Sequence, residues 1–92
     1  MRFSLDQVIA QAAGMEAETR NSLVHLAAEE LAAAGVLTML RTYTDAGGAV
    51  YDIYRDEPTG KTYLTRRPVA TAQEMDALRK RLAELIDTQT SA

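Results

Sequence analysis

The stretch Val24-His-Leu-Ala-Ala-Glu-Glu-Leu-Ala-Ala-Ala-Gly-Val-Leu37 decides the predicted fold, because it joins the end of a helix to the start of a strand. An apolar stripe with helical spacing is formed by Val24, Ala28, Leu31 and Ala34. Gly35 follows the stripe, and glycine can adopt the left-handed conformation that ends many helices. Val36 and Leu37 then open an extended segment. A helix is therefore expected before Gly35 and a strand after it.

The signals of a helix start lie near the beginning of the chain. Ser4 can cap the helix, and Gln7 can complete a capping box with it. Phe3 can pack on Val8 as a hydrophobic staple. The first helix is therefore expected to begin at Leu5.

Two helices are predicted within residues 4–34. The first should end at Gly14, and the second should run from Ala17 or Arg20 to Ala34. Because the link between them is short, they should pack at a steep angle, as in a helix-turn-helix.

Residues 36–67 are predicted to form a three-stranded antiparallel sheet. Strands are expected over residues 36–43, 49–56 and 61–67, with turns at residues 45–48 and 57–60. Four-residue loops would align Leu40, Ile53 and Leu64 on one face and Met39, Tyr54 and Tyr63 on the other. The same register places Arg41 directly opposite Asp52.

A C-terminal helix is predicted over residues 71–87, followed by a frayed tail at residues 88–92. Thr71 and Glu74 form a second capping box. Heptad-like apolar positions follow, at Met75, Leu78, Leu82 and Leu85. This stripe can cover its own sheet as a lid, or form a seam with the same helix of a second copy. Ile86 widens the stripe, which favours the homodimer, and the two uses can coexist.

The chain is expected to be a single α+β domain over residues 1–92, ordered α-α-β-β-β-α. It has 92 residues, a formal net charge of −3 and no cysteine, which excludes disulfides and thiolate metal sites. No apolar run approaches the roughly 18 residues that a membrane span needs. A cytoplasmic protein is expected. The acidic balance counts against DNA as the main partner.

Catalytic and cofactor signals are weak. His25 is the only histidine, and Glu29 lies one helical turn after it, which we interpret as a solvated surface pair. Gly60-Lys61-Thr62 resembles the end of a phosphate-binding loop, but Arg55 stands where that pattern requires its first glycine. We expect no enzyme activity, no metal and no cofactor.

The apolar helix ending in Ala-Gly-Val-Leu and followed by a hairpin resembles the third helix and wing of winged helix-turn-helix domains. The resemblance covers residues 4–56. It implies a DNA-reading surface on the outward N-terminal half of the second helix, at Arg20, Asn21, Ser22 and His25. The chain departs from the family in two respects: the usual first helix is missing, and Glu29 and Glu30 would repel phosphate.

A protein-binding surface is the stronger expectation. Tyrosine, methionine and arginine are enriched in protein interfaces. The predicted patch consists of Met39, Tyr43, Tyr54, Tyr63, Arg66 and Arg67. The alternative interpretation is that the tyrosines are core residues under the C-terminal helix. The expected function is a non-enzymatic, homodimeric, protein-binding adaptor, regulator or inhibitor; the alternative is a small DNA-binding transcriptional regulator.

Overall fold

The computed structural model describes residues 3–90 of the chain. Its elements are α1 (Leu5–Ala12), α2 (Ala17–Ala33), β1 (Leu37–Thr44), β2 (Val50–Asp56), β3 (Thr62–Arg66) and α3 (Ala72–Thr90). The strands form one antiparallel sheet in the order β1-β2-β3. This α-α-β-β-β-α order, with a small antiparallel sheet and a C-terminal helix, confirms the predicted α+β class.

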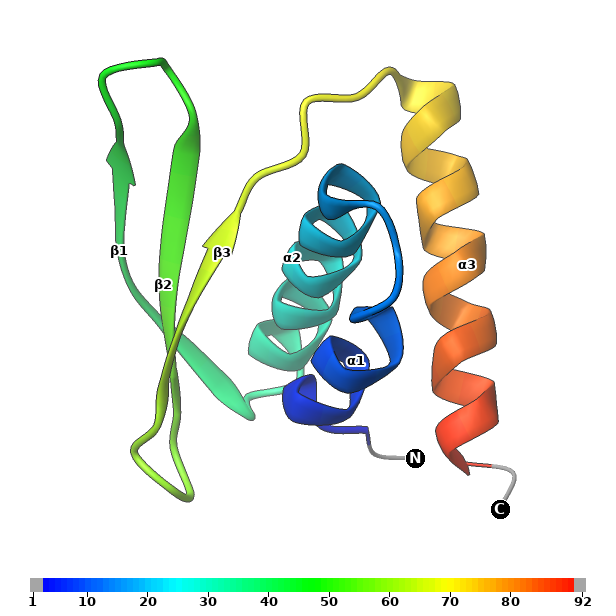
Figure 1. The fold of residues 1–92 in the computed structure, drawn as a ribbon. Helices are drawn as coiled ribbons and strands as arrows, with labels where there is room; N and C mark the ends of the chain where they lie inside the picture. Colours follow the sequence, from blue (N-terminus) through cyan, green and yellow to red (C-terminus); the bar gives the residue numbers. More distant parts are fainter. Residues whose placement is uncertain (1–2, 91–92) are drawn as a thin grey trace.

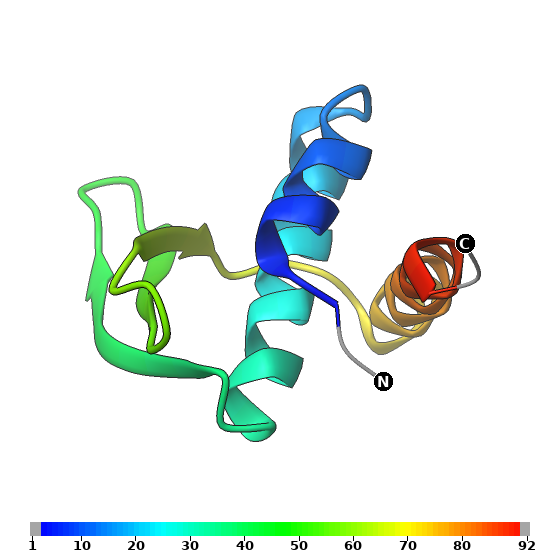
Figure 2. The same ribbon diagram turned by 90° about the horizontal axis from the view of Figure 1, so that it is seen from below.

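Helix α2 is the centre of the fold. The sheet packs on one side of α2, α1 lies beside it, and α3 lies on the side away from the sheet (Figures 1 and 2). Among the buried residues of α2, Leu23, Ala27 and Ala28 have no exposed surface. Because it is covered from both sides, α2 carries buried residues around much of its circumference.

The predicted start of α1 is confirmed. The Gln7 backbone N–H donates to Ser4 Oγ over 3.2 Å, and the Ser4 N–H donates to Gln7 Oε1 over 3.3 Å, which completes the capping box. Phe3 is half-buried against the core. The helix begins at Leu5, as the sequence predicts.

The predicted glycine stop after α2 is confirmed, although the helix ends at Ala33, one residue before the predicted Ala34. Gly35 has a φ of 81°. The Val36 N–H donates to the Leu31 carbonyl over 2.9 Å, and the Gly35 N–H donates to the Ala32 carbonyl over 3.1 Å. These two bonds form a Schellman motif, which turns the chain from α2 into β1.

The sheet register is partly as predicted. Met39, Tyr54 and Tyr63 are paired in one row, and Ile53 faces Leu64. The predicted pairing of Leu40 with Ile53 is wrong, because Arg41 takes that place. The loop between β1 and β2 spans residues 45–49, one residue more than predicted, which shifts the pairing of residues 41–44 by one position. An irregularity at Leu40 absorbs this shift, so residues 37–39 pair in the predicted register.

Helix α3 begins after the predicted capping box. The Glu74 N–H donates to Thr71 Oγ1 over 3.1 Å, and the Thr71 N–H donates to Glu74 Oε1 over 2.9 Å. The prediction that the helix ends at residue 87 is wrong, since it continues to Thr90. The Thr88 hydroxyl donates back to the Glu84 carbonyl within this extension. Residues 91 and 92 of the predicted tail lie outside the described residues.

The apolar stripe of α3 packs on the other helices of the same chain. Leu82 and Ile86 belong to the core, with 1% and 7% of their surface exposed. The remaining stripe residues are half-buried against that core: Met75, Leu78 and Leu85. The predicted lid over the sheet is wrong, because residues 67–71 carry the chain across α2 to its opposite side. The homodimer seam stays a prediction. Its central residue Leu82 is already covered within the single chain.

Candidate functional site

The two faces of the sheet differ in what they contact. In β2, Asp52 and Tyr54 are buried towards α2, whereas Tyr51, Ile53 and Arg55 alternate with them on the other face. The cross-strand partners extend that second face over the sheet. We define the outer sheet face as Arg41, Tyr43, Tyr51, Ile53 and Leu64.

The outer sheet face is apolar and open. Leu64 is 56% exposed and Tyr43 is 39% exposed. The Tyr43 and Tyr51 rings stack, with their centroids 5.2 Å apart and their planes 18° apart. Leu40, at the irregularity of β1, is exposed as well. All three helices lie on the opposite side of the sheet (Figures 1 and 2), so no described helix covers this face.

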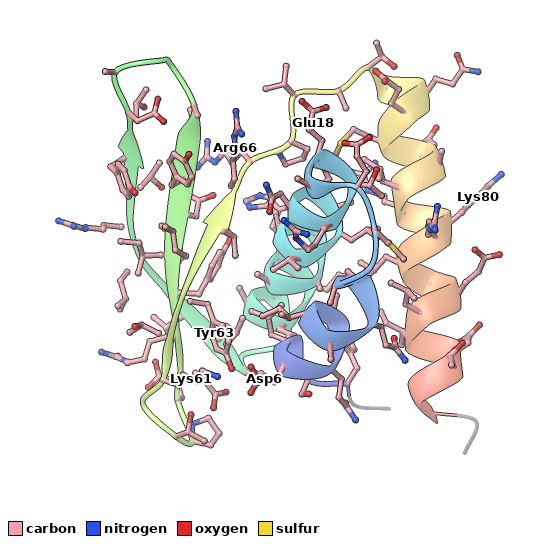
Figure 3. The ribbon with its side chains drawn as sticks, viewed as in Figure 1. Asp6, Glu18, Lys61, Tyr63, Arg66 and Lys80 are labelled. Atoms are coloured by element: carbon pink, nitrogen blue, oxygen red, sulfur yellow. The ribbon has the colours of Figure 1, made fainter. Side chains whose placement is uncertain are left out.

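The structure corrects the predicted partner-binding patch. Tyr54 is only 4% exposed and belongs to the core, so its assignment to that patch is wrong. The reason is that its row faces α2. Tyr63, in the same row, is half-buried next to Lys61, whose Nζ lies 5.0 Å from the ring centroid and 3.0 Å from Asp6 Oδ1 (Figure 3). Met39 is 49% exposed.

A buried polar cluster joins α2 to the sheet. His25, Asp52 and Thr65 are 2%, 3% and 2% exposed. His25 Nδ1 lies 3.0 Å from Thr65 Oγ1, and the Thr65 hydroxyl also donates to the Asp52 carbonyl over 3.3 Å. His25 Nε2 lies 3.9 Å from Asp52 Oδ2. We name His25, Asp52, Thr65 and their ion-pair partner Arg67 the polar cluster.

Arg67 neutralises Asp52 within this cluster. Its Nε donates to Asp52 Oδ2 over 2.8 Å, and its Nη2 donates to Oδ1 over 3.0 Å. The Thr42 hydroxyl donates to Oδ1 as well. The hydrogen bonds from Arg67 hold the pKa of Asp52 below its ordinary value, with a smaller contribution from Thr42. The predicted pair of Arg41 with Asp52 is wrong, because the shifted register puts Thr42 opposite Asp52.

The assignment of His25 to an outward, DNA-reading surface is wrong. Its ring enters the interface between α2 and the sheet because the sheet covers that side of the helix. The predicted pairing with Glu29 exists, with 3.6 Å between Nε2 and Oε2, but only the Glu29 side chain is exposed. The solvated pair that the sequence suggests is therefore a contact between a buried ring and a surface carboxylate.

Burial makes folding sensitive to the protonation of His25. Burial is the main cause that lowers the pKa of His25, against the opposing effects of Glu29 and Asp52. A lowered pKa in the folded state means that the unfolded chain binds the proton more tightly, so stability is lost as pH falls below about 6.5.

We expect the melting temperature to fall between about pH 7.5 and pH 5 and a His25→Gln variant to lose much of this dependence. Thermal melts followed by circular dichroism measure it. Glu29→Gln is the matched control, because it removes a charge that raises the pKa of His25 and should keep the dependence. An equally steep pH profile for His25→Gln would show that His25 is not responsible.

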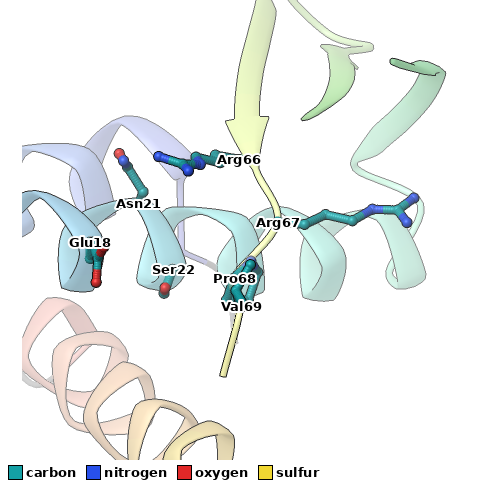
Figure 4. A pocket seen from close by; sticks show the side chains of 7 residues that line it. All are labelled: Glu18, Asn21, Ser22, Arg66, Arg67, Pro68 and Val69. Atoms are coloured by element: carbon teal, nitrogen blue, oxygen red, sulfur yellow. The ribbon is translucent and has the colours of Figure 1, made fainter. Parts of the chain in front are cut away.

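A hollow lies between α2 and the chain that leaves β3. Its volume is about 390 Å³, including the part open to solvent, and it is lined by Glu18, Asn21, Ser22, Arg66, Arg67, Pro68 and Val69. Arg66 points towards Asn21, whereas Arg67 extends away from both (Figure 4). Asn21 and Ser22, predicted as DNA contacts, are half-buried here, and Arg20 is half-buried on the same helix. The fold thus brings Arg66 of the predicted protein-binding patch together with two of the predicted DNA contacts.

Comparison of the chain with protein-family models, with curated proteins and with solved structures gives no match. Within residues 3–90, no helix is long and apolar enough to cross a membrane. In that same part of the chain, no three histidine, aspartate or glutamate side chains are grouped so as to hold a metal ion.

Proposed function

We propose that this chain is a non-enzymatic protein-binding domain, used as an adaptor, a regulator or an inhibitor, and that its partner binds the outer sheet face. The observation that carries the proposal is the uncovered surface formed by the stacked tyrosines with Ile53 and Leu64. Exposed aromatic and aliphatic side chains gathered on one face are typical of protein interaction sites.

The charges of this face select the kind of partner. Arg41 lies beside Ile53 and makes no ion pair with any described residue. Arg55, at the border of the face, is paired with Glu57 at 3.1 Å. A partner that presents apolar side chains and a carboxylate opposite Arg41 would complement both features. The partner is therefore proposed to be a protein with an acidic, partly apolar surface.

A pair of variants tests this surface. Leu64→Ala combined with Tyr43→Ala should weaken binding of a purified partner by about 30-fold for each side chain removed, since interface anchors contribute about 2 kcal/mol each. Met39→Ala is the matched control, because Met39 is equally exposed but belongs to the row of Tyr54. The partner is first identified by photo-crosslinking from position 64, and its dissociation constant is then measured. Equal affinities of the double variant and the control would overturn the proposal.

The DNA-binding alternative has one feature in its favour, the grouping of Asn21, Ser22 and Arg66. Against it, His25 is buried and Glu18 lies in the same hollow. Binding of random duplex DNA separates the two functions, because a DNA-binding protein shows affinity that falls steeply with salt. Such affinity at low salt would replace the protein-binding proposal.

We also propose that the protein is cytoplasmic, because its sequence contains no cysteine.

A further inference from the structure

The hollow beside α2 gathers polar groups whose hydrogen-bonding capacity is unused. Within residues 3–90, the side chains of Asn21, Ser22 and Arg66 make no hydrogen bond or ion pair. They present an amide, a hydroxyl and a guanidinium to one hollow, with Arg66 pointing towards Asn21 (Figure 4). All three can donate hydrogen bonds to the oxygens of an anionic group.

The backbone that carries these groups is held in place by the polar cluster. Thr65 and Arg67, the neighbours of Arg66 in sequence, are bonded to His25 and Asp52 respectively. Asn21 and Ser22 precede His25 by about one turn of the same helix. The backbone at this hollow is therefore fixed before a ligand binds, which lowers part of the entropic cost of binding.

Glu18 restricts which anion can bind. Its carboxylate lines the same hollow as Arg66, near the start of α2 (Figures 3 and 4). It would repel a phosphate, which carries more than one negative charge, but would attract an ammonium group. Pro68 and Val69 add apolar wall, and Val69 is 97% exposed.

We propose that this hollow binds a small zwitterion, with its carboxylate on Arg66, Asn21 and Ser22 and its ammonium on Glu18. An α-amino acid with an aliphatic side chain has this chemistry, and its side chain would contact Pro68 and Val69. The site adjoins the outer sheet face, because Arg66 pairs with Tyr51 across the sheet.

The probe for a titration followed by NMR chemical shifts is L-valine. N-acetyl-L-valine lacks the ammonium and L-valinamide lacks the carboxylate, so each should bind the parent protein about tenfold more weakly or worse. Inorganic phosphate serves as the simple anion. Saturable binding of L-valine, with shifts centred on Asn21, Ser22 and Arg66, is the expected result.

Two variants assign the two charges. Arg66→Gln should lose binding of both L-valine and N-acetyl-L-valine, whereas Glu18→Gln should weaken L-valine and strengthen N-acetyl-L-valine. Arg41→Gln, which removes an arginine on the outer sheet face, is the matched control and should bind as the parent does. The proposal is overturned if no saturable shift occurs, if phosphate or N-acetyl-L-valine binds the parent as well as L-valine does, or if Arg41→Gln loses affinity equally.

Discussion

Replacing Leu82 with alanine is expected to lower the free energy of unfolding by about 2–5 kcal/mol. Leu82 is 1% exposed and lies where α3 packs against α1 and α2. Removing its side chain deletes apolar contacts and leaves a cavity, because helices on two sides limit how far the site can collapse. Urea unfolding followed by circular dichroism measures the loss.

Leu64→Ala is the matched control for this experiment, because it removes the same atoms from a side chain that is 56% exposed. Its effect should stay within about 0.5 kcal/mol. A parent whose stability rises with protein concentration would instead support the homodimer seam. In that case, replacing Leu78 and Leu85 together with glutamate should leave a folded monomer, whereas an intramolecular helix contact predicts loss of the fold.

The local signals in the sequence explain why the order of elements could be predicted. Capping at Ser4 and Thr71 and the glycine stop at Gly35 each depend on residues within a few positions, and each is present in the structure. The register depends on loop length, which composition does not determine. A loop of five residues instead of four changed the partner of Asp52 from Arg41 to Thr42.

The polar cluster could not be predicted for a different reason. Thr65 and Asp52 look like surface residues of alternating strands, and Arg67 looks like one of several solvated cations. They become a buried network only because the sheet packs on the His25 side of α2. The buried Tyr54 follows from the same packing. The alternation of residues along β2 could be predicted, but the face that α2 would cover could not.

Replacing Arg67 with alanine is expected to lower the free energy of unfolding at neutral pH, and clearly more than replacing its neighbour Arg66 does. The variant leaves the Asp52 carboxylate, 3% exposed, without its cation, and an uncompensated buried charge is strongly destabilising. The loss should be smaller than for a fully buried ion pair because 49% of the Arg67 side chain is exposed to solvent. Arg66→Ala is the matched control, since the neighbouring arginine makes no ion pair within the described residues, and its effect should be within about 0.5 kcal/mol.

The pH dependence of this cost distinguishes an ion pair from a packing effect. In the parent, the lowered pKa of Asp52 gives stability that is present above its ordinary value of 3.8 and is lost as pH falls through the lowered one. Without Arg67, burial should raise the pKa of Asp52, so the folded variant takes up a proton more readily than the unfolded chain. The pKa of His25, which Arg67 lowers, should rise as well. The stability difference between parent and variant should therefore shrink as pH falls from about 7 to 4, as measured by urea unfolding. A difference that stays constant over this range would mean that Arg67 stabilises the fold through its packing and not through its charge.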